Sequence, residues 1–342
     1  MHLNILLGWS IGYSMKILVT GGLGFIGSNF IIHVIKNFKD FEIINLDAET
    51  HGSNHDNLKD IDDSDKYTFV KGNITNKKLV EDLISQSDCV VNFAAESHVD
   101  RSIADPNPFL VSNIRGVFTI LEVLKNQKKR FIQISTDEIF GTIKEGSATE
   151  LTRFNPSSPY AATKAAAELL INSYFITYGC DVVITRCTNN YGPHQFFEKL
   201  IPKTISLSRQ NKQIPIYGNG KSVRDWIFVE DHCEAIMSVL ENGNKGEAYN
   251  ISASNEIDNL EIVKKILGIL NKSEELIKFG QSRPGEDTRY SLDSTKIRRE
   301  LKWTPKTDFD EGLRKTIQWY ETNIEWSKDI SDKVFSHTPW SD

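Results

Sequence analysis

The stretch Thr20-Gly21-Gly22-Leu23-Gly24-Phe25-Ile26-Gly27 decides how this chain folds. It follows a run typical of a buried strand and opens a run with apolar residues at helical spacing. Gly21 permits a tight turn, Gly24 lets the backbone approach a pyrophosphate, and Gly27 lets the helix pack against the strand. The free N–H groups and the dipole at such a helix start favour an anion. The pattern therefore predicts a dinucleotide site.

Short strand-like and helical runs alternate from this point onward. We expect strands at 16–20, 41–46, 67–71, 89–93, 130–135 and 182–187, and helices near 25–37, 76–86, 107–126 and 158–178. This alternation is typical of the α/β class with a doubly wound parallel sheet, in which the carboxyl ends of the strands meet at one ligand-binding edge. The sequence therefore predicts a Rossmann-like domain.

The regular alternation of strands and helices ends at about residue 190, beyond which Pro and Gly become frequent. We expect shorter strands at 214–217 and 248–251 and helices near 197–210, 229–242, 258–271 and 309–325. These elements predict a smaller α/β lobe that closes over the carboxyl edge of the sheet. The expected division is an extension of doubtful role (1–14), a cofactor domain (15–190), a substrate lobe (191–330, with some chain crossing between lobes) and a tail (331–342).

Composition places the chain among ordinary globular proteins with a sizeable core: 342 residues, 39% hydrophobic and 25% charged. The net charge of −6 gives no basic field for a nucleic acid. The four cysteines are widely spaced without a metal-ligand pattern, which favours free thiols in the reducing cytoplasm and no metal. No apolar run approaches the roughly 20 residues of a membrane span, and the first residues lack the basic start of a signal peptide.

Asp47 ends the expected second strand and suggests which dinucleotide binds. A carboxylate at this position accepts bonds from an adenosine ribose and repels a 2′-phosphate, so NAD is favoured over NADP. A glycine turn without a ligand is the alternative. The strand, the helix and Asp47 occurring together make that alternative the weaker one.

Tyr160 and Lys164 stand at i and i+4 of an expected helix and so share one face. A neighbouring ammonium lowers the pKa of a phenol, so the pair would make a base that works near neutral pH. The lysine could also hold the nicotinamide ribose. Thr136, at the end of the strand before this helix, would add a hydroxyl bonded to Tyr160 or to the hydroxyl being oxidised. Two unrelated surface residues are the alternative interpretation of such a pair.

Asp137 and Glu138 follow Thr136 directly. A solvated acidic turn is the commoner explanation of an Asp-Glu pair. At the carboxyl edge of a nucleotide site, however, two adjacent carboxyl groups can take different protonation states and act as one acid and one base. Oxidation of an alcohol needs a single base, so the pair suggests a second proton transfer, such as the elimination of water.

The chain resembles the dTDP-glucose 4,6-dehydratases, within the extended short-chain dehydrogenase/reductases, from about residue 15 to residue 320. The resemblance rests on the runs FAAESHVDRSI (93–103), STDEIFG (135–141), PSSPYAATKAAAE (156–168), NNYGPHQFFEKLIP (189–202), PIYGNGKSVRDWIFVEDH (215–232) and RPGEDTRY (283–290). The Asp-Glu pair after the threonine is the discriminating feature, because sugar 4-epimerases of the same superfamily lack it.

The resemblance implies a lyase that acts on dTDP-glucose with tightly bound, recycled NAD, in deoxysugar and polysaccharide biosynthesis such as that of rhamnose. Tyr160 would take the C4 hydroxyl proton as hydride leaves C4, Glu138 would remove the C5 proton, and Asp137 would protonate the leaving C6 hydroxyl. Hydride would then return to C6. The same dehydration of UDP-glucose, a nucleotide-sugar 4-epimerase or decarboxylase, and a non-catalytic NAD-binding regulator remain alternatives.

The resemblance also implies a set of site residues. The catalytic set is Thr136, Asp137, Glu138, Tyr160 and Lys164. The NAD set is Gly21, Gly24, Phe25, Ile26, Gly27, Asp47, Asn73, Ile74, Ala94, Ala95, Ser112, Tyr160, Lys164 and Asn190. The nucleotide-sugar set is Ser97, Thr136, Asn189, Glu198, Lys199, Leu200, Pro215, Tyr217, Arg224, Asn259, Arg289 and Tyr290. Lys199, Arg224 and Arg289 would meet the diphosphate, for which the planar guanidinium is suited.

A few positions depart from the family pattern. The segment 48–54 (AETHGSN) replaces a Leu-Thr-Tyr-Ala-Gly-Asn run, Asn73 stands where an Asp is usual, and Thr288 replaces the first of two arginines. These changes leave the nucleobase, thymine or uracil, open. The resemblance further implies a homodimer in which the helices at 107–126 and 158–178 form a four-helix interface.

Overall fold

The computed structural model describes residues 14–327. The expected N-terminal extension, apart from residue 14, and the expected tail 331–342 lie outside the described residues.

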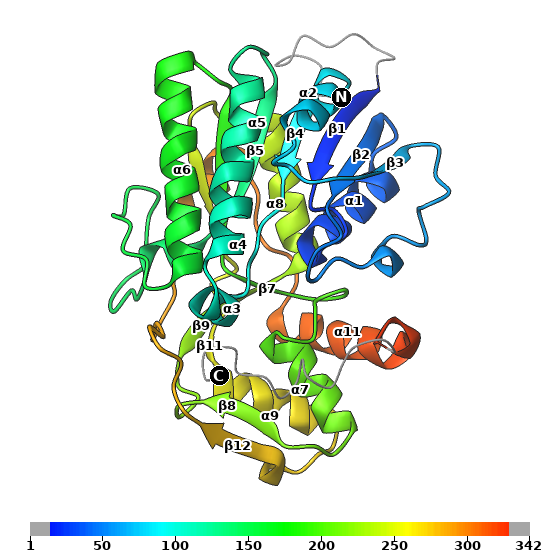
Figure 1. The fold of residues 1–342 in the computed structure, drawn as a ribbon. Coiled ribbons are helices and arrows are strands. Elements are labelled where there is room, and N and C mark those ends of the chain that lie inside the picture. The colour runs from blue at the N-terminus through cyan, green and yellow to red at the C-terminus, as the bar shows by residue number, and fades with distance from the viewer. Residues whose placement is uncertain (1–13, 328–342) are drawn as a thin grey trace.

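A seven-stranded sheet in the order β10-β6-β5-β4-β1-β2-β3 forms the centre of the larger part of the molecule (Figure 1). Its strands are β1 (Met15–Thr20), β2 (Phe41–Asp47), β3 (Tyr67–Lys71), β4 (Cys89–Asn92), β5 (Arg130–Thr136), β6 (Val182–Cys187) and β10 (Ala248–Ile251). All neighbouring strands pair in parallel. The doubly wound parallel sheet expected from the sequence is therefore confirmed.

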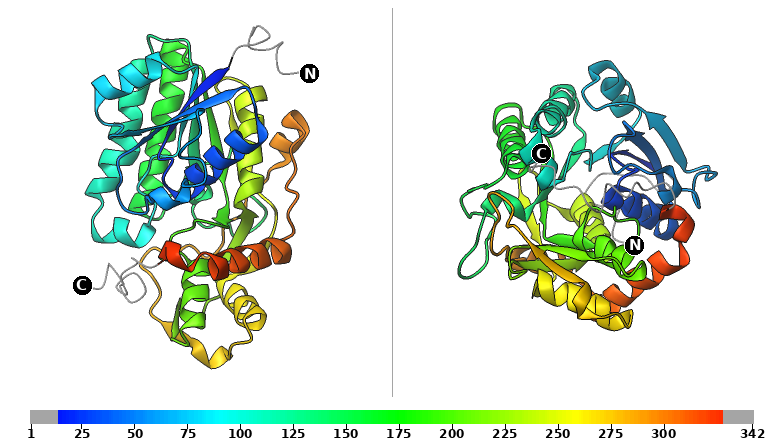
Figure 2. Two further views of the ribbon diagram at one scale, coloured as in Figure 1. Left: turned by 90° about the vertical axis from the view of Figure 1, so that its right-hand side faces the viewer. Right: turned by 60° about the horizontal axis from the view of Figure 1, so that its bottom comes forward.

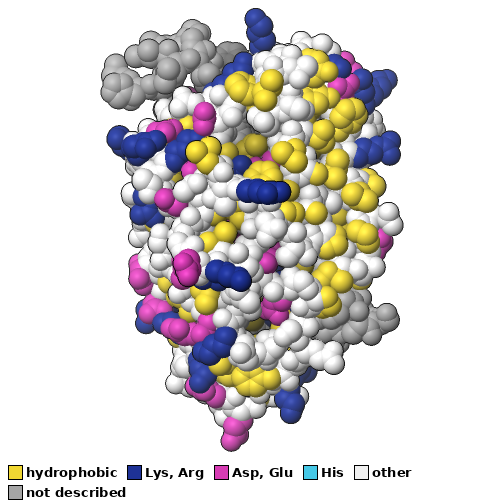
Figure 3. Space-filling view, turned by 90° about the vertical axis from the view of Figure 1, so that its left-hand side faces the viewer, with side chains coloured by type: hydrophobic (Ala, Val, Ile, Leu, Met, Phe, Trp, Pro, Cys, Tyr) yellow, Lys and Arg dark blue, Asp and Glu magenta, His cyan; other side chains and the backbone are white. Residues whose placement is uncertain are grey.

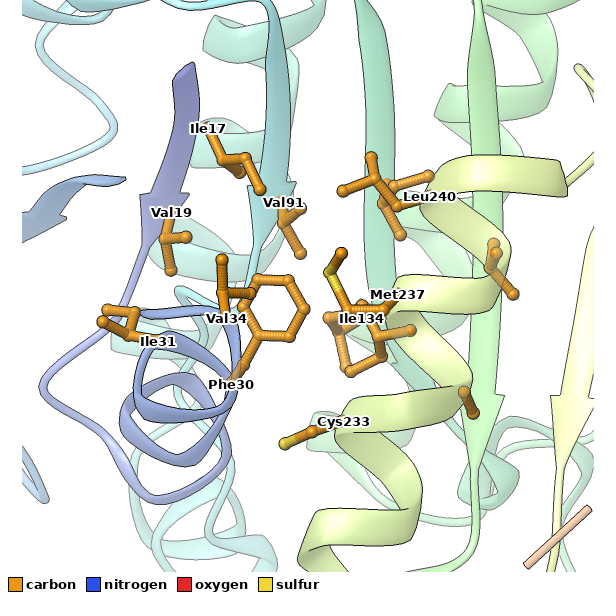
Figure 4. Packing of buried hydrophobic residues seen from close by; sticks show 14 of the residues in the cluster. Ile17, Val19, Phe30, Ile31, Val34, Val91, Ile134, Cys233, Met237 and Leu240 are labelled. Carbon is orange, nitrogen blue, oxygen red and sulfur yellow. The ribbon is translucent and has the colours of Figure 1, made fainter. Parts of the chain in front are cut away.

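Helices cover both faces of this sheet because its strands are apolar on both sides, as in β4, where every residue is buried. The cover consists of α1 (Phe25–Asn37) and α8 (Val229–Asn242) on one face, and of α2 (Lys77–Ser85), α5 (Val117–Leu124) and α6 (Pro159–Tyr178) on the other. Figure 4 shows the first face, where Phe30 and Val34 of α1 meet Met237 of α8 over the strands.

The helix expected at 107–126 is present over 107–124, with a π-helical middle. It consists of a short helix α4 (Asn107–Phe109), a π-helical segment (Leu110–Gly116) and α5. The side chain of Asn113, in the π-helical segment, exchanges hydrogen bonds of 2.9 and 3.0 Å with the backbone of Glu96 and donates one of 3.0 Å to the Thr163 hydroxyl. These buried bonds fasten the wider helical turn to the loop after β4.

The smaller lobe packs below the carboxyl edge of the large sheet (Figures 1 and 2). Its sheets are β11-β9-β7 and β12-β8. Its elements are β7 (Asn189–Tyr191), α7 (Leu200–Arg209), β8 (Ile214–Tyr217), β9 (Val223–Phe228), β11 (Glu256–Asp258), α9 (Asn259–Ile269), β12 (Ile277–Gly280) and α11 (Phe309–Thr322). The short helix α3 (Val99–Ala104) and helix α10 (Thr295–Leu301) pack with the larger part, α10 through Ile297. Its core gathers aromatic side chains, among them Tyr191, Trp226 and Phe309.

The chain crosses between the two parts more than once. Although α8 and β10 follow residue 190, both pack on or in the large sheet. The domain boundary near residue 190 stays a prediction.

All four cysteines are buried and free. None of the helices within 14–327 has the combination of length and apolarity needed to cross a bilayer. Across the same residues, no group of three or more His, Cys, Asp and Glu could hold a metal ion.

Candidate active site

Two cavities of about 650 and 620 Å³ lie at the carboxyl edge of the large sheet. The first extends from the glycine turn along the ends of the strands. The second extends into the smaller lobe, between α7, β8 and α9. Both cavities share six lining residues: His98, Glu138, Asn189, Gln195, Glu198 and Lys199. The two cavities therefore meet at Glu138, one of the two carboxyl groups singled out from the sequence.

The glycine turn has the geometry that a pyrophosphate site requires. Gly21 has a φ of +73°, and a Cβ there would lie 2.6 Å from the backbone nitrogen of Ala94. A Cβ on Gly27 would lie 2.4 Å from the Gly21 carbonyl oxygen. Helix α1 begins after Gly24 without any side chain capping its first N–H groups. The residues that carry these N–H groups line the first cavity, where the N–H groups can receive an anion, so the turn fits a dinucleotide.

Asp47 organises the loop beside this turn. Its buried carboxylate accepts hydrogen bonds from the backbone N–H of Leu23 (3.0 Å), the backbone N–H of Glu49 (2.8 Å) and the Ser53 hydroxyl (2.8 Å). A carboxylate can accept about four such bonds, so Asp47 retains capacity for a ribose hydroxyl.

Every residue expected to contact NAD lines the first cavity. These residues are Gly21, Gly24, Phe25, Ile26, Gly27, Asp47, Asn73, Ile74, Ala94, Ala95, Ser112, Tyr160, Lys164 and Asn190. The site can therefore hold an extended dinucleotide, with its pyrophosphate at the start of α1 and its far end near Tyr160.

Thr136, at the end of β5, leads into a 3₁₀ turn at Asp137–Phe140. Its hydroxyl caps that turn by accepting the Glu138 N–H at 3.3 Å, and it lies 3.2 Å from Asp137 Oδ1. The chain then turns away at Gly141, where φ is +65° and a Cβ would lie 2.3 Å from the carbonyl oxygen of Asn155. The turn therefore fixes both carboxyl groups at the end of a central strand.

The two carboxyl groups lie in different surroundings. Asp137 is only 3% exposed, its Oδ2 has no hydrogen-bond partner, and burial together with the Glu138 charge raises its pKa well above the ordinary value. Burial also raises the pKa of Glu138, but Arg283, Lys199 and Arg224 act against this. The geometry supports a protonated Asp137 beside a Glu138 that ionises more readily.

Tyr160 and Lys164 lie on the buried face of α6, in the wall of the first cavity. Burial and the Glu138 charge raise the pKa of Tyr160 well above its ordinary value, opposite to the direction expected from Lys164. The Lys164 ammonium instead donates to the Ile134 carbonyl at 2.6 Å, and burial lowers its pKa to about 8. The sequence could not show that the burial of Tyr160 has a larger effect on its pKa than the charge of Lys164.

The second cavity is lined by several cations. Lys199 and Arg224 lie in it as expected, and the Arg224 guanidinium sits 4.3 Å from the centre of the Tyr290 ring. Arg289 does not line either cavity, because its guanidinium makes two bonds to Glu256, at 2.6 and 2.7 Å.

Arg283 lines the second cavity in its place and bonds Asp100 at 3.1 Å. The sequence analysis did not single out Arg283, although it belongs to the same RPGEDTRY run.

The other residues expected to bind a nucleotide sugar divide between the cavities. Ser97 and Thr136 line the first, Asn189, Glu198 and Lys199 line both, and Leu200, Pro215, Tyr217, Arg224, Asn259 and Tyr290 line the second. The Tyr217 hydroxyl donates to Asp100 at 3.0 Å. His98 also lines both cavities, and burial lowers its pKa to about 4.

Comparison with known proteins gives consistent matches. The sequence model of the GDP-mannose 4,6 dehydratase family matches residues 18–316. The dTDP-glucose 4,6-dehydratase of Xanthomonas campestris pv. campestris is 42% identical over 337 residues, which cover 92% of this chain and 95% of that protein. The solved structure of the dTDP-glucose 4,6-dehydratase of Streptomyces venezuelae with NAD and TYD bound is 41% identical, covers 91% of this chain and 98% of that one, and has a TM-score of 0.90.

Epimerases match at lower identity. The UDP-glucuronic acid 4-epimerase of Bacillus cereus, solved with UDP-glucuronic acid and NAD, is 28% identical, covers 90% of this chain and 99% of that one, and has a TM-score of 0.86. The fold is thus shared with the epimerases, whereas the sequence is more similar to the dehydratases.

Proposed function

Because the chain belongs to the dTDP-glucose 4,6-dehydratase family, we propose that it removes water from dTDP-glucose to give dTDP-4-dehydro-6-deoxy-glucose, with NAD as its recycled cofactor. The observation that carries this proposal is the pair Asp137 and Glu138, placed at the end of β5, with Glu138 in the wall shared by the two cavities. Oxidation or epimerisation at C4 alone would leave this pair without a use.

Bound NAD supplies a reversible hydride acceptor. The chain's own residues move the protons. Tyr160 Oη, beside the Thr136 hydroxyl, would accept the proton of the sugar C4 hydroxyl as a phenolate. Burial and the Glu138 charge oppose this form, whereas the positive charge of an oxidised nicotinamide would favour it. Glu138 takes the C5 proton, which the C4 ketone makes acidic, while the protonated Asp137 gives its proton to the C6 hydroxyl that leaves as water. Lys164, anchored on Ile134, orients the far end of the cofactor.

The cations of the second cavity support a diphosphate substrate. Lys199, Arg224 and Arg283 reach this space from three separate elements, and partly buried guanidinium groups bind phosphate oxygens in pairs. The same three charges act on Glu138. Substrate phosphates would therefore partly neutralise the cations that lower the Glu138 pKa, and so make Glu138 a stronger base once substrate is bound.

We also propose that the protein is a homodimer. Large apolar side chains lie exposed along the π-helical segment, α5 and α6, and hydrophobic side chains gather over the centre and right of the face seen in Figure 3. They include Leu110, Val111, Phe118, Leu169 (62% exposed), Ile176 (72% exposed) and Tyr178. A gathering of exposed apolar side chains on neighbouring helices is typical of an association surface, and a second copy would cover it by pairing these helices. The buried free cysteines support a cytoplasmic location.

Incubation of the purified protein with dTDP-glucose, without added reductant, followed by mass spectrometry tests the activity. Loss of one water is the expected result, and Glu138→Gln should abolish that product while the cofactor stays bound. An unchanged mass with a C4 epimer would favour an epimerase. If UDP-glucose loses water and dTDP-glucose does not, the mechanism stands and the nucleobase is uracil.

A further inference from the structure

A contact between His51 and Glu198 links the larger part of the molecule to the segment that leads into the smaller lobe, beside the residues that line both cavities. His51 lies in the loop after β2, and Glu198 lies in the segment between β7 and α7. The distance between His51 Nε2 and Glu198 Oε2 is 2.7 Å. The imidazole also packs edge-on against Phe196, with 5.0 Å between the ring centroids. His51 belongs to the segment 48–54, where this chain departs from the family pattern.

Glu198 lies where the hexose of the substrate must sit if the proposed function is correct. It lines both cavities together with Glu138 and Lys199, at the junction of the cofactor space and the diphosphate space. Burial by itself would raise the pKa of Glu198, but the hydrogen bond with His51, followed by the charges of His98 and Lys199, lowers it to about 2. The carboxylate is therefore charged and, because it can accept about four hydrogen bonds, retains acceptors for sugar hydroxyls.

His51 is the histidine that holds this carboxylate. His98 Nε2 is also near, but it lies 3.9 Å from Glu198 Oε2, beyond hydrogen-bond distance, and burial lowers its pKa to about 4. A free glutamate side chain samples several rotamers, and its ordering costs entropy each time a ligand binds. A carboxylate already fixed by a partner avoids that cost.

We propose that His51 is a positioning residue for the hexose: it holds the Glu198 carboxylate in the shared wall, ready to accept hydrogen bonds from the sugar hydroxyls. This inference rests on the proposed function. It concerns the hexose alone, since the proposed function puts the nucleotide in the second cavity, which His51 does not line.

Calorimetric binding of two ligands to the NAD-loaded protein tests the inference. One is dTDP, which has no hexose. The other is dTDP-xylose, which carries a sugar but lacks C6 and cannot lose water there. The variants are His51→Ala, His51→Gln, Glu198→Gln and the double variant His51→Ala/Glu198→Gln. His55→Ala is a matched control, because His55 makes a similar contact of 2.5 Å with Glu49 nearby but lines neither cavity.

His51→Ala should weaken dTDP-xylose binding about tenfold, as expected for a partly exposed charge-assisted hydrogen bond, and leave dTDP binding unchanged. His51→Gln should restore part of the affinity, because an amide N–H can donate to the same carboxylate. The double variant should bind like Glu198→Gln alone, because the two residues act as a unit.

Three results would overturn the inference: wild-type affinity of His51→Ala for dTDP-xylose, an equal loss for dTDP and dTDP-xylose, or losses that multiply in the double variant. A wild-type protein that binds neither ligand would instead count against the proposed function.

Discussion

Replacing Asp137 by Asn separates the two proton transfers that the site performs. Asparagine has nearly the size and shape of a protonated aspartic acid but has no proton to give. Asp137 is buried, its Oδ2 has no hydrogen-bond partner, and burial raises its pKa well above the ordinary value. Because the native carboxyl is already neutral, the variant should keep the geometry of the turn and lose only the acid.

The expected cost is the contribution of one general acid, a loss of about 10²–10⁴ in turnover. At 1.36 kcal/mol for each factor of ten, this amounts to about 3–5 kcal/mol of transition-state stabilisation. The assay is mass spectrometry of the sugar nucleotide after incubation in deuterated water. Water loss should fall by that factor, whereas Glu138 should still exchange the C5 hydrogen for deuterium. Glu138→Gln should lose both.

The stability of this variant gives a second, independent readout. A carboxyl whose pKa is raised on folding contributes stability that is fully present below its unfolded pKa of about 3.9 and is lost as the pH rises through the folded pKa. Thermal unfolding should therefore show Asp137→Asn gaining stability relative to wild type as the pH rises from about 4. Wild-type rates of water loss in this variant, or an advantage that shrinks with pH, would refute the reasoning.

Five further substitutions have defined outcomes. Gly27→Ala should lose bound NAD and lower the melting temperature, because its Cβ would lie 2.4 Å from a backbone oxygen. Gly268→Ala in α9, where a Cβ would have nothing within 4 Å, should raise the free energy of unfolding by about 0.5–1 kcal/mol. Equal melting curves for the two variants would contradict this. Lys164→Met should abolish turnover yet raise the free energy of unfolding at pH 7. This gain should shrink from pH 8 to about 10.4, because the folded wild-type protein loses the lysine proton at a lower pH than the unfolded chain does. A difference in melting temperature that does not depend on pH would be inconsistent with the lowered pKa of Lys164. Arg186 forms a buried ion pair of 2.7 Å with Glu168. Arg186→Met should lower the free energy of unfolding, measured with denaturant, by about 3–5 kcal/mol, because it leaves the Glu168 carboxylate buried and unpaired. A loss below about 1 kcal/mol would count against this. Ile176→Glu should yield a monomer in analytical ultracentrifugation if α6 lies in the dimer interface, and an unchanged dimer would place the interface elsewhere.

The sequence predicted the elements that local pattern controls. Strand and helix positions in the large sheet followed from apolar periodicity, and the run from Thr20 to Gly27 located the cofactor cavity, because a glycine turn between a strand and a helix has few other uses. The helix expected at 107–126 is present over 107–124, but its middle is π-helical, and this wider turn depends on the bonds of Asn113 to distant residues. Periodicity carries no information about such contacts.

The side-chain chemistry of the site was harder to predict. Two arginines of one short run point to different places, Arg283 into the second cavity and Arg289 onto Glu256, and their spacing does not distinguish them. The direction of the Tyr160 pKa shift depends on burial, which only the packed structure reveals. The contact between His51 and Glu198 joins residues 147 positions apart and has no sequence signature.

The strand order of the large sheet bears on how the chain folds as it is synthesised. The edge strand β10 is made after α7, α8, β8 and β9, so the open edge of β6 stays without its partner until residue 251 has left the ribosome. An unpaired strand edge is a template for aggregation. Chains released before that point should therefore associate through β6, and the cofactor domain should not fold cleanly when it is expressed without the segment that supplies β10.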